Sequence, residues 1–189
     1  MLSPDDPLPG RPRRIAIAGV SGVGKTTLSR RISRTLGIPH TEIDALFHGP
    51  DWTPRAGFLD DVEALAARDA WVTEWQYASA RPVLASRADL LVWLDLPFMT
   101  VTLPRVIRRT VRRRVRRETL WNGNAEGPLR TVFTDPEHIV RWAWSTRHTY
   151  SEIVPLADAE HDGLTVVRLR SQRDVERWLS RRLTPTAER

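Results

Sequence analysis

The octet Gly19 to Thr26, with the sequence Gly-Val-Ser-Gly-Val-Gly-Lys-Thr, constrains the fold of this chain more than any other feature. It satisfies the pattern Gly-x-x-x-x-Gly-Lys-Ser/Thr, with a short apolar run (15–18) before it and a helical pattern (25–36) after it. Glycines admit positive φ angles and let main-chain N–H groups surround phosphate oxygens, and the start of the following helix favours the same anion. The sequence therefore predicts a phosphate-binding loop between a buried strand and a helix.

The side chains of this loop indicate nucleotide chemistry. Lys25 is the single lysine among 29 basic residues, which indicates a position that requires a compact ammonium group instead of a guanidinium fork. We expect Lys25 to reach the β- and γ-phosphates of ATP as a catalytic group, and the Thr26 hydroxyl to ligate Mg²⁺. The residues of the loop expected to bind this cofactor are Gly19, Ser21, Gly22, Val23, Gly24, Lys25, Thr26 and Thr27.

Strand and helix patterns alternate along the rest of the chain. A second strand is expected to end at Ile43-Asp44, and further strands to span 70–73, 89–94 and 164–169, with helical patterns between them. After Pro97 a long helix is expected, whose apolar stripe should pack inward: Leu103, Ile107, Val111 and Val115. The alternation predicts an α/β fold in which helices cover both faces of a parallel sheet.

The composition agrees with one globular domain. The chain has 189 residues, of which 41% are apolar, and we expect a domain over 13–183 between a flexible N-terminal tail (1–12) and a C-terminal tail (184–189). No apolar run is long enough to span a membrane, and the first residues lack the apolar core of a secretory signal. We therefore expect a cytoplasmic protein with no membrane partner.

Several enzyme classes are excluded by what the sequence lacks. It has no cysteine, which excludes thiol catalysis and cysteine-ligated zinc. A guanine-selective Asn-Lys-x-Asp motif needs a second lysine, so an ordinary GTPase is disfavoured. No apolar strand ends in Asp-Glu, which disfavours a motor or AAA-type ATPase. Phosphoryl transfer from ATP to a small-molecule acceptor is the leading class that remains.

Positive charge is concentrated in one predicted helix. Eight arginines lie in a window with no acid, and without them the chain has 21 basic residues against 23 acidic ones. On one interpretation, two or three of them clamp polyphosphate from a mobile lid and the others form a solvated face. On another, the helix binds nucleic acid. The window holds Arg105, Arg108, Arg109, Arg112, Arg113, Arg114, Arg116 and Arg117.

Three acids follow predicted strands and are candidates for the site. Glu74 closes Trp71-Val72-Thr73, and Asp95 closes the strand that ends at Leu94, so either carboxylate is placed to hold Mg²⁺ directly or through water. Glu74 is the preferred candidate, because Asp95 is equally suited to cap the next helix. Asp44 is suited to an acceptor hydroxyl, as a ligand or general base, or else is an ordinary turn residue.

Three segments carry a family resemblance. They are Trp71–Glu74, then Arg87-Ala88-Asp89 leading to Trp93–Pro97, and Arg117–Glu126. Over residues 13–183 the chain resembles the adenylate-kinase-like P-loop kinases, and within them the small DNA topology modulation (FlaR-related) proteins. Relatives carry a glycine directly after the acid of the third strand, whereas Trp75 stands at this position here, and its bulk is expected to narrow the acceptor pocket.

The resemblance implies a P-loop NTPase three-layer sandwich with a five-stranded parallel sheet of order 2-3-1-4-5, ATP and Mg²⁺ as cofactors, and an Arg-rich lid at about 105–130. It implies that Glu74 stands where adenylate kinases place a magnesium-linked acid, and that the loop from Ser171 to Arg173 borders adenine. Arg105, Arg108 and Arg109 fall near the adenylate-kinase arginines that contact adenine and phosphates. The residues expected to contact the acceptor are Asp44, Tyr77 and Arg81.

These expectations combine into a Mg-ATP-dependent kinase that transfers phosphate to a small molecule, with a nucleotide or nucleoside as the favoured acceptor. The alternative is a regulatory ATP-binding protein whose Arg-rich helix binds nucleic acid.

Overall fold

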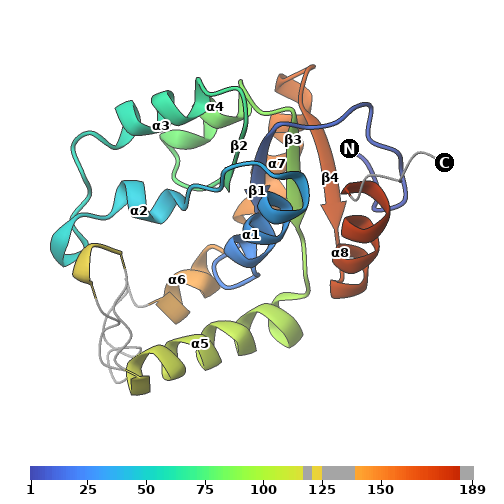
Figure 1. Ribbon diagram of the computed structural model, residues 1–189. Helices are drawn as coiled ribbons and strands as arrows, with labels where there is room; N and C mark the ends of the chain where they lie inside the picture. The colour runs from blue at the N-terminus through green and yellow to red at the C-terminus, as the bar shows by residue number, and fades with distance from the viewer. Residues whose placement is uncertain (117–120, 125–138, 184–189) are drawn as a thin grey trace.

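The computed structural model describes residues 1–116, 121–124 and 139–183. Within these residues, four parallel strands form one sheet in the order β2-β1-β3-β4 (Figure 1). They are β1 (Arg14–Ala18), β2 (Trp71–Glu74), β3 (Leu90–Leu94) and β4 (Thr165–Leu169). Their side chains are largely buried on both faces of the sheet, which is why consecutive positions are apolar and the polar–apolar alternation of a half-exposed strand is missing.

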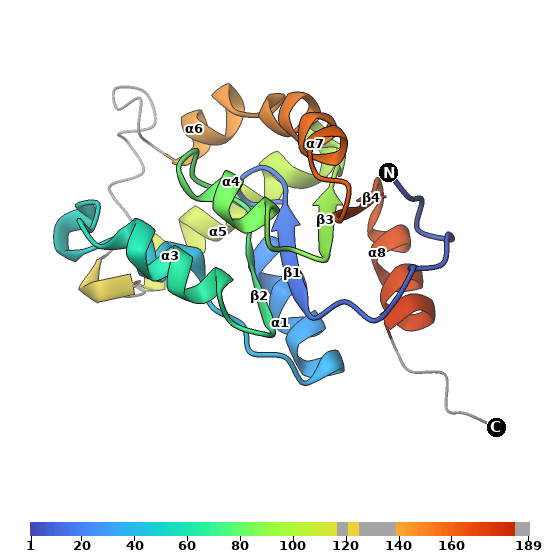
Figure 2. The ribbon, with the colours of Figure 1, turned by 90° about the horizontal axis from the view of Figure 1, so that it is seen from above.

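Helices cover both faces of this sheet, as the sequence predicts. One face packs against α1 (Lys25–Leu36) and α8 (Gln172–Trp178), and the other against α4 (Ala80–Ala85) and α7 (Thr149–Glu160) (Figure 2). The remaining helices are α2 (Ile43–Phe47) and α3 (Phe58–Ala66) on the β2 side, and α5 (Leu103–Arg116) and α6 (Ile139–Ser145) beyond the carboxyl ends of the strands. The other helical segments are the 3₁₀ turns η1 (Pro50–Trp52) and η3 (Trp121–Gly123) and the π-helical segments η2 (Phe98–Thr102) and η5 (Leu179–Leu183).

The expected fifth strand, ending at Ile43-Asp44, is wrong. The chain runs beside β2 for one bridge only, between His40 and Val72, and then turns into α2. The reason lies in the main-chain N–H of Ile43, which donates to the Glu74 carboxylate (3.1 Å) at the point where a strand would need a main-chain partner. The other strands keep the order that the resemblance implies.

The expected orientation of the arginine helix is also wrong. Val106 and Thr110 face the protein, whereas Ile107 is 44% exposed and Val115 75% exposed. The cause is close packing on the loop after β1, where a Cβ added to Gly22 would meet a Val106 methyl carbon at 2.1 Å. This approach rotates α5 by about one residue, roughly 100°, from the face that its apolar stripe predicts.

The N-terminal segment is anchored, in contrast to the loose tail expected over 1–12. Leu2 pairs with Val167 of β4, donating to the Val166 carbonyl (2.6 Å) and accepting from the Arg168 N–H (3.0 Å). The C-terminal tail (184–189) and part of the expected lid, Arg117 included, lie outside the described residues. Among the described helices, none is long and apolar enough to cross a membrane.

Candidate active site

The predicted phosphate loop joins the carboxyl end of β1 to the start of α1. Gly19, Gly22 and Gly24 have φ angles of 144°, 79° and 112°, a region that side chains with a Cβ rarely adopt. Gly22 has a second constraint in its contact with Val106. Glycine is therefore required here both by the turn of the loop and by the helix that packs on it.

The remaining loop residues differ in exposure. Val23 turns its side chain into the core, and its main-chain N–H donates to the Val20 carbonyl (3.2 Å). Ser21 and Thr26 are half-buried, whereas Thr27 is exposed. The Thr26 hydroxyl lies in the first turn of α1 and makes no hydrogen bond to another described residue.

Lys25 is buried at this loop, with 9% of its surface exposed. Its Nζ donates to the carbonyls of Gly19 (2.8 Å) and Val20 (3.3 Å). Burial lowers the pKa of Lys25 to about 8, against the opposing charges of Asp44 and Glu74. These two acids thus lie close enough to the lysine for their charges to act on it.

Two of the three arginines expected at the phosphates lie at the loop. Arg105 donates to the Val23 carbonyl (3.2 Å) and to Gln172 Oε1 (3.0 Å). Arg109 is half-buried, and its charge contributes to the lowered pKa of Lys25. Arg108 lies on the exposed face of α5, without a hydrogen bond or ion pair to another described residue. The rotation of α5 therefore turns Arg108 away from the loop that Arg105 and Arg109 face.

The segment from Ser171 to Arg173, which the resemblance places beside adenine, contacts the arginine helix through Gln172, the first residue of α8. Gln172 links Arg105 to Glu176, accepting from the first and donating to the second (3.0 Å). Arg173, the residue expected to border adenine, is exposed in the first turn of α8. The resemblance names this segment, but the contact of Gln172 with Arg105 is seen only in the fold.

The two acids considered for magnesium have different surroundings. Glu74 is buried, and its two oxygens contact His40 Nε2 (3.2 Å) and the Ile43 N–H (3.1 Å). Burial raises the pKa of Glu74, but these hydrogen bonds outweigh it and hold the pKa below its usual value. Asp95 instead forms an ion pair with Arg168, at 2.9 and 2.5 Å. Glu74 is thus an anion at the site, whereas the negative charge of Asp95 is balanced by Arg168.

These residues fit a magnesium ion bound with ATP. Mg²⁺ takes one or two protein oxygens together with phosphate oxygens and waters, and seldom a full cage of protein ligands. The half-buried Thr26 hydroxyl suits a direct ligand, and the buried, anionic Glu74 suits contact through water. No group of three or more His, Cys, Asp or Glu residues able to hold a metal occurs in the described ranges.

A second polar cluster lies beside the lysine and is centred on Asp44. Its Oδ1 accepts from the Tyr77 hydroxyl (2.7 Å) and from the Gln76 amide, and the Tyr77 hydroxyl also contacts His48 Nε2 (3.1 Å). Asp44 Oδ2 has no hydrogen-bond partner among the described residues. Burial raises the pKa of Asp44, although the hydrogen bond from Tyr77 opposes this. One carboxylate oxygen is therefore held in place while the other stays open to a ligand.

Tyr77 is held as a donor to this carboxylate. Burial and the negative charge of Asp44 raise the pKa of Tyr77 far above its usual value, so the hydroxyl stays protonated. The residue has a positive φ of 63°, and its ring stacks on Phe47 with the centroids 3.9 Å apart. An aromatic contact thus helps to hold a backbone conformation that is unusual for a tyrosine.

Arg81 and Trp75 contact each other at the start of α4, where the Arg81 N–H donates to the Tyr77 carbonyl (3.1 Å). Trp75 is 3% exposed, and its indole N–H donates to the Arg81 carbonyl (2.9 Å), while the Arg81 guanidinium lies 5.8 Å from the ring centre. Since successive side chains of an extended chain point to opposite faces, Trp75 packs on the side of α4 and α7, away from Glu74. The expectation that Trp75 narrows the acceptor pocket is wrong, because its ring belongs to the core.

A short segment after the arginine helix contacts the chain that follows α2. Asn124 is buried, donates to the Gly49 carbonyl (2.9 Å) and accepts from the Trp52 N–H (3.1 Å), and Asn122 donates to the His48 carbonyl. The Asn-Gly pair at 122–123 predicts a turn, but the sequence does not indicate which segment this turn contacts. His48, Gln76 and Asn124 are the site residues that sequence reasoning missed.

No protein-family model and no curated protein matches this sequence. Among solved structures, a gluconokinase from Sinorhizobium meliloti 1021 is 21% identical, with a TM-score of 0.51 over 93% of this chain and 92% of the other. A shikimate kinase from Acinetobacter baumannii, solved in complex with shikimate, is 18% identical, with a TM-score of 0.49 over 89% of this chain and 88% of the other. The likeness to the gluconokinase, together with the loop and the parallel sheet, shows that the chain has the P-loop kinase fold.

Proposed function

We propose that this protein transfers the γ-phosphoryl group of Mg-ATP to a hydroxyl group of a small molecule. The observation that carries this proposal is the Asp44 carboxylate beside Lys25, with Oδ1 held by Tyr77 and Oδ2 open. A base next to a phosphate loop is what a hydroxyl acceptor requires, because its proton must leave as the oxygen attacks. The fold supports the same class of reaction.

In the proposed reaction, Oδ2 of Asp44 takes the proton of the acceptor hydroxyl. The acceptor oxygen forms a bond to the γ-phosphorus as the bond from phosphorus to the β–γ bridging oxygen breaks, and ADP leaves with that electron pair. The raised pKa of Asp44 makes its carboxylate a better base than an exposed aspartate. Tyr77 and Gln76 orient the carboxylate without using the oxygen that accepts the proton.

The cations of the site stabilise the charge that moves during transfer. Lys25 approaches the β- and γ-phosphates from the loop, and Arg109 approaches from α5. Arg105 bridges the loop and Gln172, which suits a residue that positions the nucleotide. Magnesium, held by Thr26 and through water by Glu74, would neutralise phosphate charge when bound.

We infer the chemical class of the acceptor from the sequence motifs and from the Asp44 carboxylate. The motifs at 71–74 and 87–97 support a relative of the adenylate-kinase-like and DNA topology modulation proteins, and hence a nucleoside or nucleotide. A phosphate acceptor is already ionised and needs no base, whereas a sugar hydroxyl does. The open Oδ2 of Asp44 therefore favours a nucleoside, or another polyol, over a nucleoside monophosphate.

A screen of ADP release tests this function. Purified protein with Mg-ATP is offered nucleosides, nucleoside monophosphates and small hydroxy acids, gluconate and shikimate included. With the acceptor so found, Asp44→Asn should lower kcat by a factor of about 10² to 10⁴ and leave ATP binding intact. Asp60→Asn, at an exposed position on α3, is the matched control and should be unchanged. Failure of every acceptor, combined with salt-sensitive DNA binding, would replace the kinase by the nucleic-acid alternative.

A metal titration tests the role of Glu74 separately. Glu74→Gln should lower turnover and weaken its dependence on Mg²⁺, with little change in the binding of metal-free ATP. Asp95→Asn should have the smaller effect, because this carboxylate already pairs with Arg168. The reverse order of effects would assign the magnesium role to Asp95.

A further inference from the structure

A second cationic site lies at the amino end of the sheet, the end away from the phosphate loop. Because the strands are parallel and in register, the segments that precede β1, β2 and β3 meet there: Arg14 is level with Trp71, and Ile15 with Leu90. Together these segments line an open cleft of about 620 Å³. The residues that line it are Arg11, Arg13, Arg14, Ala66, Ala67, Arg68, Asp69, Arg87 and Asp89.

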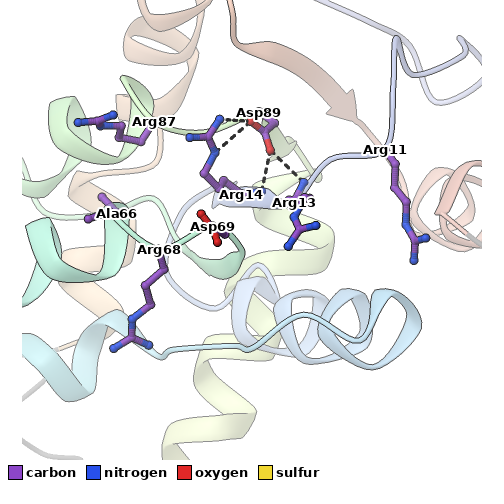
Figure 3. Close-up of a pocket in the computed structure, with 9 residues that line it drawn as sticks. Arg11, Arg13, Arg14, Ala66, Arg68, Asp69, Arg87 and Asp89 are labelled. Carbon is purple, nitrogen blue, oxygen red and sulfur yellow. Dashed lines mark hydrogen bonds and ion pairs between the residues drawn. The ribbon is translucent and has the colours of Figure 1, made fainter.

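Positive charge dominates this cleft. Five of its nine lining residues are arginines and two are aspartates. One of the two acids is already neutralised, because Asp89 accepts from Arg14 Nε (3.1 Å) and Nη2 (2.6 Å) and from the N–H groups of Arg13 and Arg14 (2.9 Å each) (Figure 3). The remaining charges are four arginines against Asp69.

The four other arginines are available to a ligand. Among the described residues, no hydrogen bond or ion pair engages the guanidinium groups of Arg11, Arg13, Arg68 and Arg87. They come from three segments around one cleft, with Arg11 and Arg87 at opposite sides of the close-up (Figure 3). Outside the window 105–117 the chain has slightly more acids than bases, so this local excess of cations is not a general property of the surface.

We propose that this cleft binds a small polyphosphate, an anion with two or more phosphoryl groups such as an oligophosphate or the phosphate chain of a nucleotide. Arginine suits this ligand, because its planar fork makes paired hydrogen bonds to phosphate oxygens. Spaced cations on several segments suit several phosphates better than one. The lining has no aromatic side chain on which a base could stack, and the cations surround one cleft instead of forming a stripe, which favours a small ligand over a nucleic-acid strand.

Calorimetric titration with inorganic tripolyphosphate tests the site. The parent protein should show two sites, one in the phosphate loop and one in the cleft. Arg13→Ala combined with Arg68→Ala should weaken one of them by about tenfold or more, and Lys25→Ala should weaken only the other. Arg13 keeps its main-chain hydrogen bonds in this variant, because Asp89 and Trp71 contact its backbone and not its guanidinium.

The matched control removes the same charge elsewhere. Arg34→Ala combined with Arg181→Ala deletes two exposed arginines that lie outside the cleft, and both sites should survive. Equal weakening by the two double-arginine variants would overturn the proposal. So would a Lys25→Ala variant that no longer binds tripolyphosphate at any site. A nucleoside triphosphate that binds through Arg13 and Arg68 supports it. Tighter binding of a short oligothymidylate through the same arginines overturns it in favour of nucleic acid.

Discussion

Both ends of the sheet carry positive charge, but they hold it in different ways. At the carboxyl end, Lys25 is buried, its ammonium group contacts two main-chain carbonyls, and burial lowers its pKa to about 8. At the amino end, Arg13, Arg68 and Arg87 are exposed around an open cleft. The first arrangement is a closed cradle for one charge, and the second is a set of separate charges in water.

These two arrangements suit different functions. A buried and oriented charge acts strongly on a transferring phosphoryl group, because little water screens it and no reorganisation is needed during the reaction. Exposed arginines are screened and mobile, so they bind an anion without holding it in one geometry. The carboxyl end therefore suits catalysis, and the amino end suits binding alone.

Exchange of the cation type gives the largest expected contrast between the two ends. Lys25→Arg should lower turnover by about 10² or more although the charge is kept, because the planar fork does not fit where Nζ lies 2.8 Å from the Gly19 carbonyl. Arg68→Lys in the open cleft should leave turnover unchanged. Steady-state kinetics with the identified acceptor would measure both. Near-normal turnover of Lys25→Arg would show that the loop is not a fitted catalytic cradle.

Removal of Asp89 tests the amino end as a structural element. Asp89→Ala leaves the N–H groups of Arg13 and Arg14 without their acceptor and should destabilise the fold by about 1–3 kcal/mol. The low end of this range is favoured, because the Asp89 side chain is 32% exposed. Chemical denaturation would measure the loss, and turnover should change little. Loss of turnover with unchanged stability would contradict the separation of the two ends.

The same variant has a pH dependence with a defined sign. Burial raises the pKa of Asp89, but the hydrogen bonds from Arg14 and from the main chain outweigh it and hold the pKa below its usual value. Its stabilising contribution is therefore present above the ordinary aspartate pKa and is lost as pH falls through the lowered one. The stability difference between the parent and Asp89→Ala should shrink below about pH 4.

The features that the sequence predicts correctly are local ones. The phosphate loop is contiguous, each of its residues has a local reason, and its flanking strand and helix are confirmed by the structure. The parallel sheet and its covering helices follow from the alternation of patterns, and they too are confirmed. The place of Glu74 at the end of a buried strand is a local property of the chain and is also confirmed.

What the sequence could not predict depends on contacts between distant segments. The fifth strand fails because Glu74 captures the N–H of Ile43, and the face of α5 is decided by Val106 packing on Gly22. His48 and Asn124 enter the site through turns whose partners are far along the chain. A one-residue rotation of a helix changes which side chains face the protein, which is why Arg109 is half-buried at the loop and Arg108 is exposed.

A change at Tyr77 tests the acceptor side with a smaller expected effect. Tyr77→Phe keeps the stacking on Phe47 but removes the hydrogen bond that lowers the pKa of Asp44. The pKa of Asp44 should rise further, so the acidic limb of the kcat/KM profile should move to higher pH, because a general base must be deprotonated. The plateau rate should change by less than about tenfold, since the base itself remains. An unmoved limb would remove Asp44 from the role of base.

The smallest effect is expected from the ion pair of Arg31 with Glu176, which lies outside the cleft and, among the described residues, contacts the active-site residues only through Gln172. Arg31 of α1 donates two hydrogen bonds to Glu176 of α8 (2.7 and 2.6 Å), and this contact lowers the pKa of Glu176 to about 2. The two side chains are 40% and 52% exposed, so a double-mutant cycle with alanine should give a coupling of less than about 1 kcal/mol that decreases with salt. The coupling should be full above the ordinary glutamate pKa, about 4.3, and disappear as pH falls towards 2. Arg31 and Glu176 share two short hydrogen bonds, but they lack the contacts with main-chain N–H groups that Asp89 makes. A coupling as large as the loss from Asp89→Ala would therefore contradict the view that these main-chain contacts, and not the ion pair, account for that loss.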